Sequence, residues 1–190
     1  MRVIAGKAKG RRLHPVPGSG TRPILDRVKE SLFNILSWEV DDARFLDLYA
    51  GTGSVGIEAL SRGAAHADFV EKAGKAIATI KRNLKETGLG DRATVIRRDV
   101  FDFIADAEGE YDLIFLAPPQ YRGLWADTLH ALDRRPSLLA SDGKVIAQID
   151  PLEFEDLALE NLVLVDRRTY GSTMLCFYSH RRDAAPDDGT

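Results

Sequence analysis

Apolar and polar residues alternate along this chain in two recurring patterns, short apolar runs and longer amphipathic stretches. The apolar runs are typical of buried strands and cover residues 44–50, 67–71, 93–99, 111–117 and 143–150. Apolar residues spaced three and four apart predict helices at residues 24–36, 54–62, 75–88 and 123–132, with a helical turn at 100–105. Because strands and helices alternate at short intervals, the sequence predicts an α/β domain with a mostly parallel sheet.

Two of the predicted helices have recognisable ends and inner faces. Helix 24–36 has Asp26 as a candidate N-cap, and helix 75–88 ends at Gly88, a typical C-cap residue. The apolar residues expected to face inward are Val28, Leu32, Phe33, Ile35 and Leu36 in the first helix, and Ile77, Ile80 and Leu84 in the second.

The two ends of the chain depart from the alternating pattern. Residues 161–171 and 172–180 are apolar segments joined only by a Tyr-Gly-Ser turn, so they should pair as an antiparallel hairpin that closes the sheet. At the start of the chain, residues 2–6 and 11–16 are short extended segments around the basic turn "KAKG", which predicts a small N-terminal β-hairpin.

The composition is that of a globular protein, with 44% hydrophobic and 29% charged residues. No apolar run is long enough to cross a membrane, and no signal segment opens the chain. We therefore expect a cytoplasmic protein with no membrane partner. The single cysteine, Cys176, excludes an internal disulfide framework, and the four scattered histidines offer no metal-ligand spacing, so no metal is expected.

Charge is distributed unevenly although the net charge is only −3. Before the first acid, Asp26, the chain carries six basic residues: Arg2, Lys7, Lys9, Arg11, Arg12 and Arg22. Such an arm predicts contact with nucleic-acid phosphates, although a solvated terminus would show the same pattern. We expect a hairpin arm at residues 1–20, one α/β domain at 21–182 and a disordered tail at 183–190.

Residues 51–56 spell G-x-G-x-x-G between a predicted strand and a predicted helix. Gly51, Gly53 and Gly56 would let backbone approach a ligand at the helix N-terminus. Glu71 closes the next strand, where an acid can accept hydrogen bonds from ribose hydroxyls. A dinucleotide such as NAD would fit this pattern, so the motif alone leaves the ligand open.

Two features favour S-adenosylmethionine (AdoMet) over NAD. Asp47 lies four residues before Gly51, where a carboxylate is unfavourable beside a pyrophosphate but suits the ammonium group of AdoMet. The chain also has little room for a dinucleotide domain and a separate substrate domain. Asp99, at the end of the following strand, could reach the adenine amino group.

The stretch "LIFLAPPQY" ends a buried strand with two consecutive prolines. Proline cannot donate to a sheet, so the carbonyl oxygens of Ala117, Pro118 and Pro119 form a stiff, donor-free corner at a strand's carboxyl end. Such carbonyls can hold a base's exocyclic amine, and Tyr121 can stack on the base. Alternatively, the two prolines could merely end the strand, with Tyr121 half-buried in packing contacts.

The sequence resembles a known family in the order of five segments. "RVIAGKAKGRRL", "TRPILDRVKESLFNIL", "FLDLYAGTGSVGIEALSRGA", "FVEK" and the Pro-Pro-x-Tyr corner look like the bacterial 16S rRNA (guanine-N2)-methyltransferases of the RsmD type, over about residues 2–180. The resemblance implies a Rossmann-like class I AdoMet-dependent methyltransferase fold. It also implies methyl transfer to N2 of guanine 966 of 16S rRNA, on the assembled or nearly assembled 30S subunit, by an enzyme expected to be monomeric.

By the same resemblance, Asp47, Gly51 and Gly53 would hold the methionine part of AdoMet, Glu71 the ribose and Asp99 the adenine. The helix after Arg22 would close over the cofactor. Members of the family usually have Asp or Asn where this chain has Ala117. Backbone carbonyls could replace the missing acceptor, Gln120 could supply one, or activity could be weak.

Two other functions remain open at this point. A DNA amino-methyltransferase could use the same corner on adenine N6, although the chain has no additional domain for reading a DNA groove. A binding module that has lost catalysis could also lack the acceptor at Ala117, but it would have no use for an intact set of cofactor acids.

Overall fold

The computed structural model describes residues 1–18 and 23–181, so Arg22 and the predicted tail 183–190 lie outside the described residues. Seven strands form one sheet in the order β3-β2-β1-β4-β5-β7-β6. The strands are β1 (Arg44–Leu48), β2 (His66–Glu71), β3 (Ala93–Arg97), β4 (Tyr111–Leu116), β5 (Leu139–Ile149), β6 (Leu162–Tyr170) and β7 (Thr173–His180).

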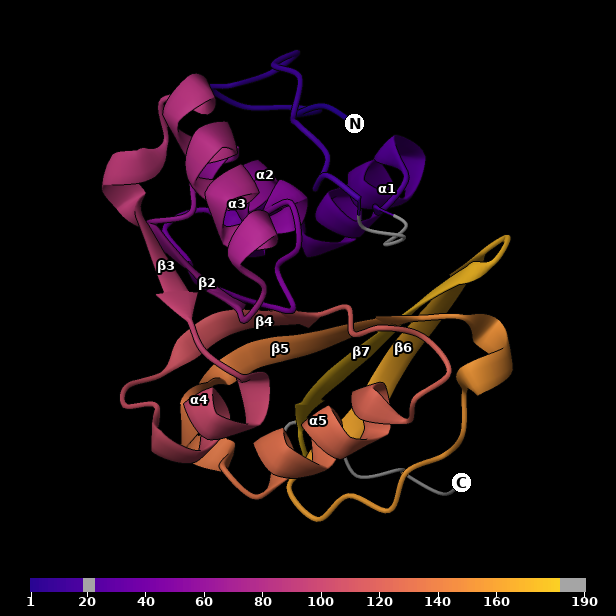
Figure 1. Cartoon of the computed structure of the whole chain (residues 1–190). Helices are drawn as coiled ribbons and strands as arrows, with labels where there is room; N and C mark the ends of the chain where they lie inside the picture. Colours follow the sequence, from indigo (N-terminus) through magenta and orange to yellow (C-terminus); the bar gives the residue numbers. More distant parts are fainter. Residues whose placement is uncertain (19–22, 182–190) are drawn as a thin grey trace.

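Helices cover both faces of this sheet (Figure 1). On one face lie α1 (Asp26–Leu36), α2 (Ser54–Ser61) and α3 (Gly74–Thr87), and on the other α4 (Val100–Asp106) and α5 (Leu124–Asp133). Four short 3-10 turns are η1 (Ser37–Val40), η2 (Gly90–Arg92), η3 (Pro136–Leu138) and η4 (Pro151–Glu153).

Strands β1 to β5 pair in parallel, and β7 pairs antiparallel with both β5 and β6. The predicted α/β fold with a closing antiparallel hairpin is therefore confirmed. The fifth strand begins earlier than the sequence pattern predicts, at Leu139 instead of 143, with a register shift against β4.

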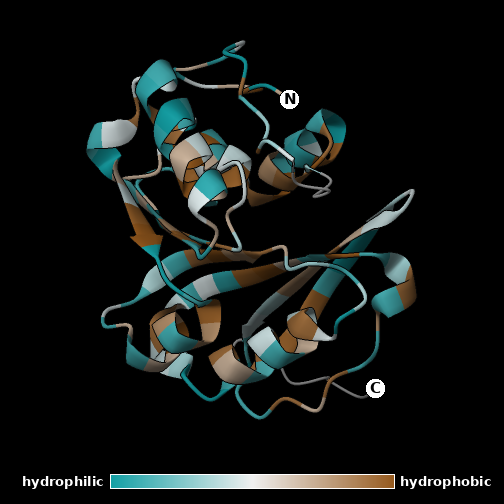
Figure 2. Cartoon of the chain, viewed as in Figure 1, coloured by the Kyte–Doolittle hydropathy of each residue, from teal (hydrophilic) through white to brown (hydrophobic). Residues whose placement is uncertain are grey.

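The period-two alternation of the buried strands divides the core into two layers. In β4, Leu113 and Phe115 pack toward the helices α1 to α3, whereas Ile114 and Leu116 pack toward α4 and α5. Figure 2 shows brown apolar residues along the sheet and on the inner sides of the helices. Each strand thus supports two helical layers, which holds its carboxyl end in a fixed place.

Helix α1 differs in two respects from its prediction. Asp26 is the first residue of the helix and not its N-cap, and it pairs with Arg2 at 3.3 Å instead of capping backbone amides. Ile35 is 37% exposed, while Lys29, a charged residue that the apolar pattern cannot select, is fully buried on the inner face.

The N-terminal arm, residues 1–18, is packed against the domain. It forms the predicted hairpin as a single antiparallel bridge between Arg2 and Arg12, without two regular strands. Val3, Ala8 and Leu13 of the arm are buried in the same core layer as α1, α2 and α3. Apolar residues of the arm therefore face inward, which leaves its basic residues for the outer surface.

The buried carboxylate of Glu58 on α2 holds this arm. It accepts hydrogen bonds from the backbone N–H groups of Ile4 at 2.8 Å and Ala5 at 3.0 Å. It also pairs with Arg62 at 2.8 Å and with Lys29 at 3.3 Å. Four donors thus converge on one carboxylate that is inaccessible to water, which offsets its desolvation.

The ammonium group of Lys29 completes this cluster. It donates to the carbonyl of Arg2 at 2.7 Å and to the hydroxyl of Ser54, the first residue of α2, at 3.0 Å. Burial lowers the pKa of Lys29, while the neighbouring Glu58 opposes that shift. The pair therefore joins α1, α2 and the arm at one point.

Within the described segments, no helix has the length and apolar character needed to cross a membrane.

Replacing Lys29 tests the importance of this pair. Lys29→Met removes the ammonium but leaves the Glu58 carboxylate buried, so we expect a loss of about 3–5 kcal/mol in the free energy of unfolding. Urea denaturation measures it. Lys144→Met is the matched control, because Lys144 pairs with Glu39 at 2.6 Å in a partly exposed position and should cost no more than about 1 kcal/mol. Equal losses in the two variants would contradict a special role for Lys29.

Candidate active site

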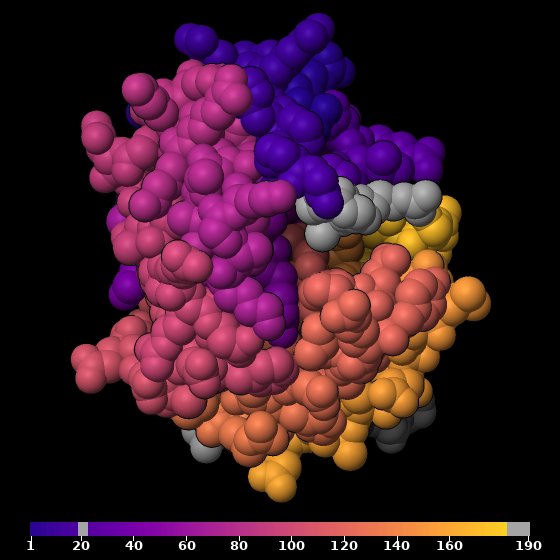
Figure 3. All heavy atoms as spheres, viewed as in Figure 1, coloured from indigo at the N-terminus to yellow at the C-terminus, as the bar shows by residue number. Residues whose placement is uncertain are grey.

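The candidate site lies where the strand order reverses, between β1 and β4. These strands are neighbours in the sheet, but the chain leaves β1 toward α2 on one face and β4 toward α5 on the other. Loops leaving such a pair diverge and open a crevice at the carboxyl edge of the sheet. Figure 3 shows a recess on this face, between purple atoms of the β1–α2 part of the chain and salmon atoms of the segment after β4.

The loop between β1 and α2 has an unusual backbone. Gly51 and Gly53 have φ angles of 56° and 75°, and Tyr49 adopts a positive φ of 58° as well. A Cβ added at Gly51 would meet nothing closer than the Tyr49 carbonyl oxygen at 3.8 Å, so the φ angle and not a lack of room requires glycine here. At Gly56, by contrast, a Cβ would lie 2.4 Å from the Phe69 ring, so this glycine permits close packing of α2 on the sheet.

Asp47 lies beneath this loop rather than in the open crevice. Its carboxylate is only 2% exposed and accepts a hydrogen bond from the backbone N–H of Gly56 at 3.0 Å. Burial raises the pKa of Asp47 from 3.8 to about 8, and the nearby Glu71 adds to the rise. The side chain thus supports the first turn of α2 and is uncharged over much of the neutral range.

Glu71, the last residue of β2, braces the same loop from the side. One carboxylate oxygen accepts from Gly51 N at 3.0 Å, and the other accepts from the backbone N–H groups of Lys72 and Ala73 at 2.9 Å. Further lone pairs of the carboxylate remain for a ligand hydroxyl.

Asp99 lies two residues beyond β3 and is the N-cap of α4. Its carboxylate accepts from Phe101 N at 2.9 Å, and this hydrogen bond is the main reason why the pKa of Asp99 is lowered. Lys72 pairs with Asp99 at 3.2 Å, and the Lys72 side chain is 74% exposed. The three acids thus lie at or near the carboxyl ends of three neighbouring strands, β1, β2 and β3.

The Pro-Pro corner begins directly after β4. Pro118 is buried, Pro119 is exposed, and the partly buried Ala117 packs against the core layer that contains α1 to α3. Tyr121 is 65% exposed and has a φ of 58°.

Two acids of the segment after β5 hold Tyr121 in this conformation. Glu153 accepts a hydrogen bond from Tyr121 N at 2.6 Å. A side-chain hydrogen bond to Asp150 is the main reason why the pKa of Tyr121 is raised. Glu153 thus holds the backbone of Tyr121 and Asp150 contacts its side chain, while the residue remains exposed to solvent.

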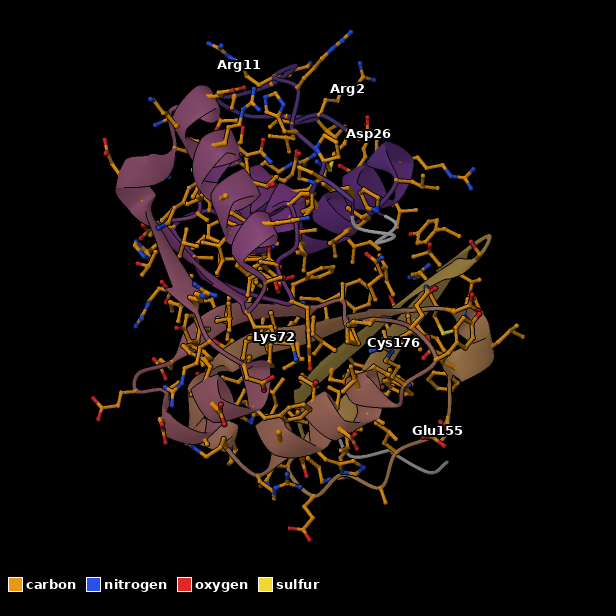
Figure 4. The ribbon with its side chains drawn as sticks, in the orientation of Figure 1. Arg2, Arg11, Asp26, Lys72, Glu155 and Cys176 are labelled. Carbon is orange, nitrogen blue, oxygen red and sulfur yellow. The ribbon has the colours of Figure 1, made fainter. Side chains whose placement is uncertain are left out.

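The described basic residues of the arm are exposed. Figure 4 shows Arg2 beside Asp26 at the start of α1, with Arg11 farther along the arm. The exposed members are Arg2, Lys7, Lys9, Arg11 and Arg12. They lie on the surface of the arm, while Arg22 is outside the described residues.

Several residues of the site gave no signal in the sequence. The Tyr49 hydroxyl hydrogen-bonds to Thr128 of α5 at 2.7 Å, so it links the two sides of the crevice. Asn83 of α3 is fully buried; its amide donates to the carbonyls of Thr52 at 2.9 Å and His14 at 3.2 Å, and accepts from His14 N at 2.8 Å. Long-range contacts such as these leave no periodic pattern or motif in the sequence.

Over residues 1–18 and 23–181, no group of three or more His, Cys, Asp and Glu side chains is arranged to hold a metal ion.

The fold and the site together define a class I AdoMet-dependent methyltransferase. A family model described as "Conserved hypothetical protein 95" matches residues 1–179. The chain belongs to this family, which is that of the RsmD-type rRNA methyltransferases. The predicted family, the predicted fold class and AdoMet as the cofactor are thereby confirmed.

Individual relatives agree with this assignment. The Bacillus subtilis protein "Putative rRNA methyltransferase YlbH" is 41% identical over 95% of this chain and 100% of its own. "Ribosomal RNA small subunit methyltransferase D" of Escherichia coli is 40% identical over 70% of this chain and 67% of its own. The solved structure of the Escherichia coli protein described as "Putative methyltransferase yhhF" superposes with a TM-score of 0.84 at 32% identity, covering 95% of this chain and 97% of that one.

The buried carboxyl of Asp47 predicts a pH dependence of stability in the absence of AdoMet. Between about pH 4 and pH 8 the unfolded chain has released this proton and the folded protein still holds it, so stability falls as pH rises. The slope is at most about 1.4 kcal/mol per pH unit. Asp47→Asn should remove this dependence. Urea denaturation of both proteins at several pH values measures the difference, and parallel pH profiles would contradict the prediction.

Proposed function

We propose that this protein transfers a methyl group from AdoMet to the exocyclic N2 of a guanine in 16S rRNA, guanine 966, in the assembled or nearly assembled 30S subunit. The observation that carries the proposal is the pairing of two loops at the β1–β4 crevice. One loop is a glycine loop bordered by acids, and the other is a donor-free corner with an exposed aromatic ring. The relatives named as rRNA methyltransferases supply the substrate class.

The acids fit the groups of AdoMet in the order of their strands. Gly51 leaves room for the methionine part to approach backbone, and Gly53, where a Cβ would instead lie 3.3 Å from Phe69, shapes the turn of the same loop. Asp47 beneath them can ionise to pair with the ammonium group. Glu71 has lone pairs left for the ribose hydroxyls, and Asp99 would accept a hydrogen bond from the adenine amine. When bound, AdoMet supplies a methyl group on a sulfonium, a leaving group that needs no metal or covalent intermediate.

The corner after β4 would receive the target base. The carbonyl oxygens of Ala117 and Pro118 are fixed acceptors for an exocyclic amine, since the two prolines restrict the backbone there. Tyr121 would stack on the guanine after it has left its neighbours in the RNA, which requires an exposed ring held in place. Hydrogen bonds from Tyr121 to Glu153 and Asp150 supply that rigidity.

The N-terminal arm would contact the RNA backbone. Its exposed residues Arg2, Lys7, Lys9, Arg11 and Arg12, together with Arg22, give it a cationic surface, while its apolar residues anchor it to the domain. We expect this contact to be sensitive to salt. We also propose that the enzyme works as a monomer in the cytoplasm, where small subunits are assembled.

Methyl transfer to ribosomal subunits tests the proposal. Labelled AdoMet is offered to 30S subunits that lack their native N2-methylguanine, with naked 16S rRNA and duplex DNA in parallel reactions. We expect label on the subunits, recovered as N2-methylguanosine at position 966. Label on DNA alone would favour an amino-methyltransferase of DNA. AdoMet binding without transfer to any of the three would favour an RNA-binding homologue that has lost catalysis.

Tyr121 variants test how the base is held. Tyr121→Ala removes the stacking face, so kcat/KM on subunits should fall about fivefold to 150-fold, equivalent to about 1–3 kcal/mol. Tyr121→Phe keeps the ring and loses only the hydroxyl contact to Asp150, so its kcat/KM should stay close to that of the unchanged enzyme. Unchanged kcat/KM in Tyr121→Ala would show that the ring does not hold the base.

A further inference from the structure

One side-chain atom stands out among the buried polar groups of the described residues. The amide oxygen Oε1 of Gln148 is buried and has no hydrogen-bond partner, and the described residues contain no other such side-chain nitrogen or oxygen. A buried acceptor without a partner costs about 1–3 kcal/mol, so proteins rarely retain one without a use. Gln148 as a whole is partly exposed, so its side chain reaches the protein surface.

The position of Gln148 places this acceptor beside the Pro-Pro corner. It lies near the end of β5, the strand that pairs in parallel with β4. The last paired residues of the two strands are Leu116 and Ala147, so Ala117 and Gln148 follow directly as neighbours at the carboxyl edge. On its other side Gln148 is paired with Leu175 of β7.

Ala117 and Gln148 also share a face of the sheet. Ala117 packs against the core layer that contains α1 to α3, as do Ile146 and Leu175. Because side chains alternate along a strand, Gln148 faces the same side as Ile146, two residues earlier. The unpartnered oxygen therefore lies beside the position where this chain has an alanine and offers no side-chain acceptor.

We propose that Gln148 is a catalytic residue whose amide oxygen accepts a hydrogen bond from the exocyclic amine of the target guanine. It thereby supplies, from the neighbouring strand, the acceptor that Ala117 lacks. This inference rests on the proposed function and specifies which side chain of the site orients the amine.

The chemistry of the step fits an amide oxygen. The amine nitrogen attacks the methyl carbon, the new N–C bond forms as the C–S bond breaks, and the sulfonium becomes a thioether. The nitrogen then gives up one proton to water, since an amide is too weak a base to take it. A hydrogen bond to Oε1 directs the nitrogen lone pair toward the methyl group and strengthens as positive charge develops on the nitrogen.

The lack of a hydrogen-bond partner for Oε1 in the free protein also favours this role. The terminal torsion of glutamine is broad, and no hydrogen bond within the described residues holds the Gln148 amide in its present orientation. Turning Oε1 toward a bound base therefore breaks no hydrogen bond that this oxygen makes in the free protein. The binding of substrate would instead satisfy an acceptor that is unsatisfied in the free protein.

Gln148→Met tests the proposal, since methionine has a similar length and no strong acceptor. We expect kcat on 30S subunits to fall about tenfold or more, with the KM values for AdoMet and for subunits little changed, because the contact matters most in the transition state. The melting temperature of the free variant should be unchanged or higher, because a buried unsatisfied acceptor is removed. A lower kcat with undiminished stability separates catalysis from a structural role.

A second substitution provides the rescue. Ala117→Asp restores a side-chain acceptor at the corner, so it should raise kcat severalfold in the Gln148→Met background, by a larger factor than any change it makes in the enzyme that keeps Gln148. Such non-additivity indicates that the two positions serve one role. Gln120→Met is compared in the same assay, since Gln120 is the exposed amide of the corner.

The outcomes separate this inference from the proposed function. If the unchanged enzyme methylates subunits and Gln148→Met does so with the same kcat, the inference is wrong and the proposed function stands. A loss of kcat in Gln120→Met but not in Gln148→Met would assign the acceptor role to Gln120 and would also overturn the inference. If the unchanged enzyme methylates none of the offered substrates although it binds AdoMet, the proposed function itself fails.

Discussion

The structure depends on one buried ion pair, between Lys29 of α1 and Glu58 of α2. Two charges without access to water are stable only when their remaining hydrogen-bonding capacity is satisfied, and here backbone groups of the arm, the Ser54 hydroxyl and Arg62 satisfy it. The Glu58 carboxylate accepts hydrogen bonds from two backbone N–H groups of the arm. The Lys29 ammonium donates to a backbone carbonyl of the arm and to the hydroxyl of Ser54, the first residue of α2. The arm, the first helix and the glycine loop therefore have fixed positions relative to one another.

The two loops of the site are stabilised in the same way, by a carboxylate that accepts from a backbone N–H. Glu71 holds Gly51 in the loop after β1, and Glu153 holds Tyr121 in the loop after β4. Both held residues have positive φ angles, a conformation that glycine adopts freely and tyrosine does not. An external hydrogen bond explains how a tyrosine can occupy such a position, with its ring directed to solvent.

The sequence alone predicts the order of strands and helices, because buried parallel strands and amphipathic helices have distinct patterns of apolar residues. It also indicates the glycine loop and its three acids, since each acid lies at or near the carboxyl end of a strand. It misplaces Asp26 and Ile35 and cannot select Lys29, because a charged residue on an inner face contradicts the apolar pattern. Contacts such as Tyr49 with Thr128, or the neighbouring positions of Ala117 and Gln148, depend on strand register, which local sequence does not contain.

The amide of Asn83 has a consequence for how the arm can be studied. This one side chain pairs with both backbone groups of His14 and with the carbonyl of Thr52 in the glycine loop. Truncation of the arm would therefore disturb the glycine loop as well as the basic surface of the arm, and lost activity would have two causes. Charge reversal at exposed positions such as Lys9 and Arg11 leaves the inner contacts intact, so it isolates the electrostatic contribution of the arm.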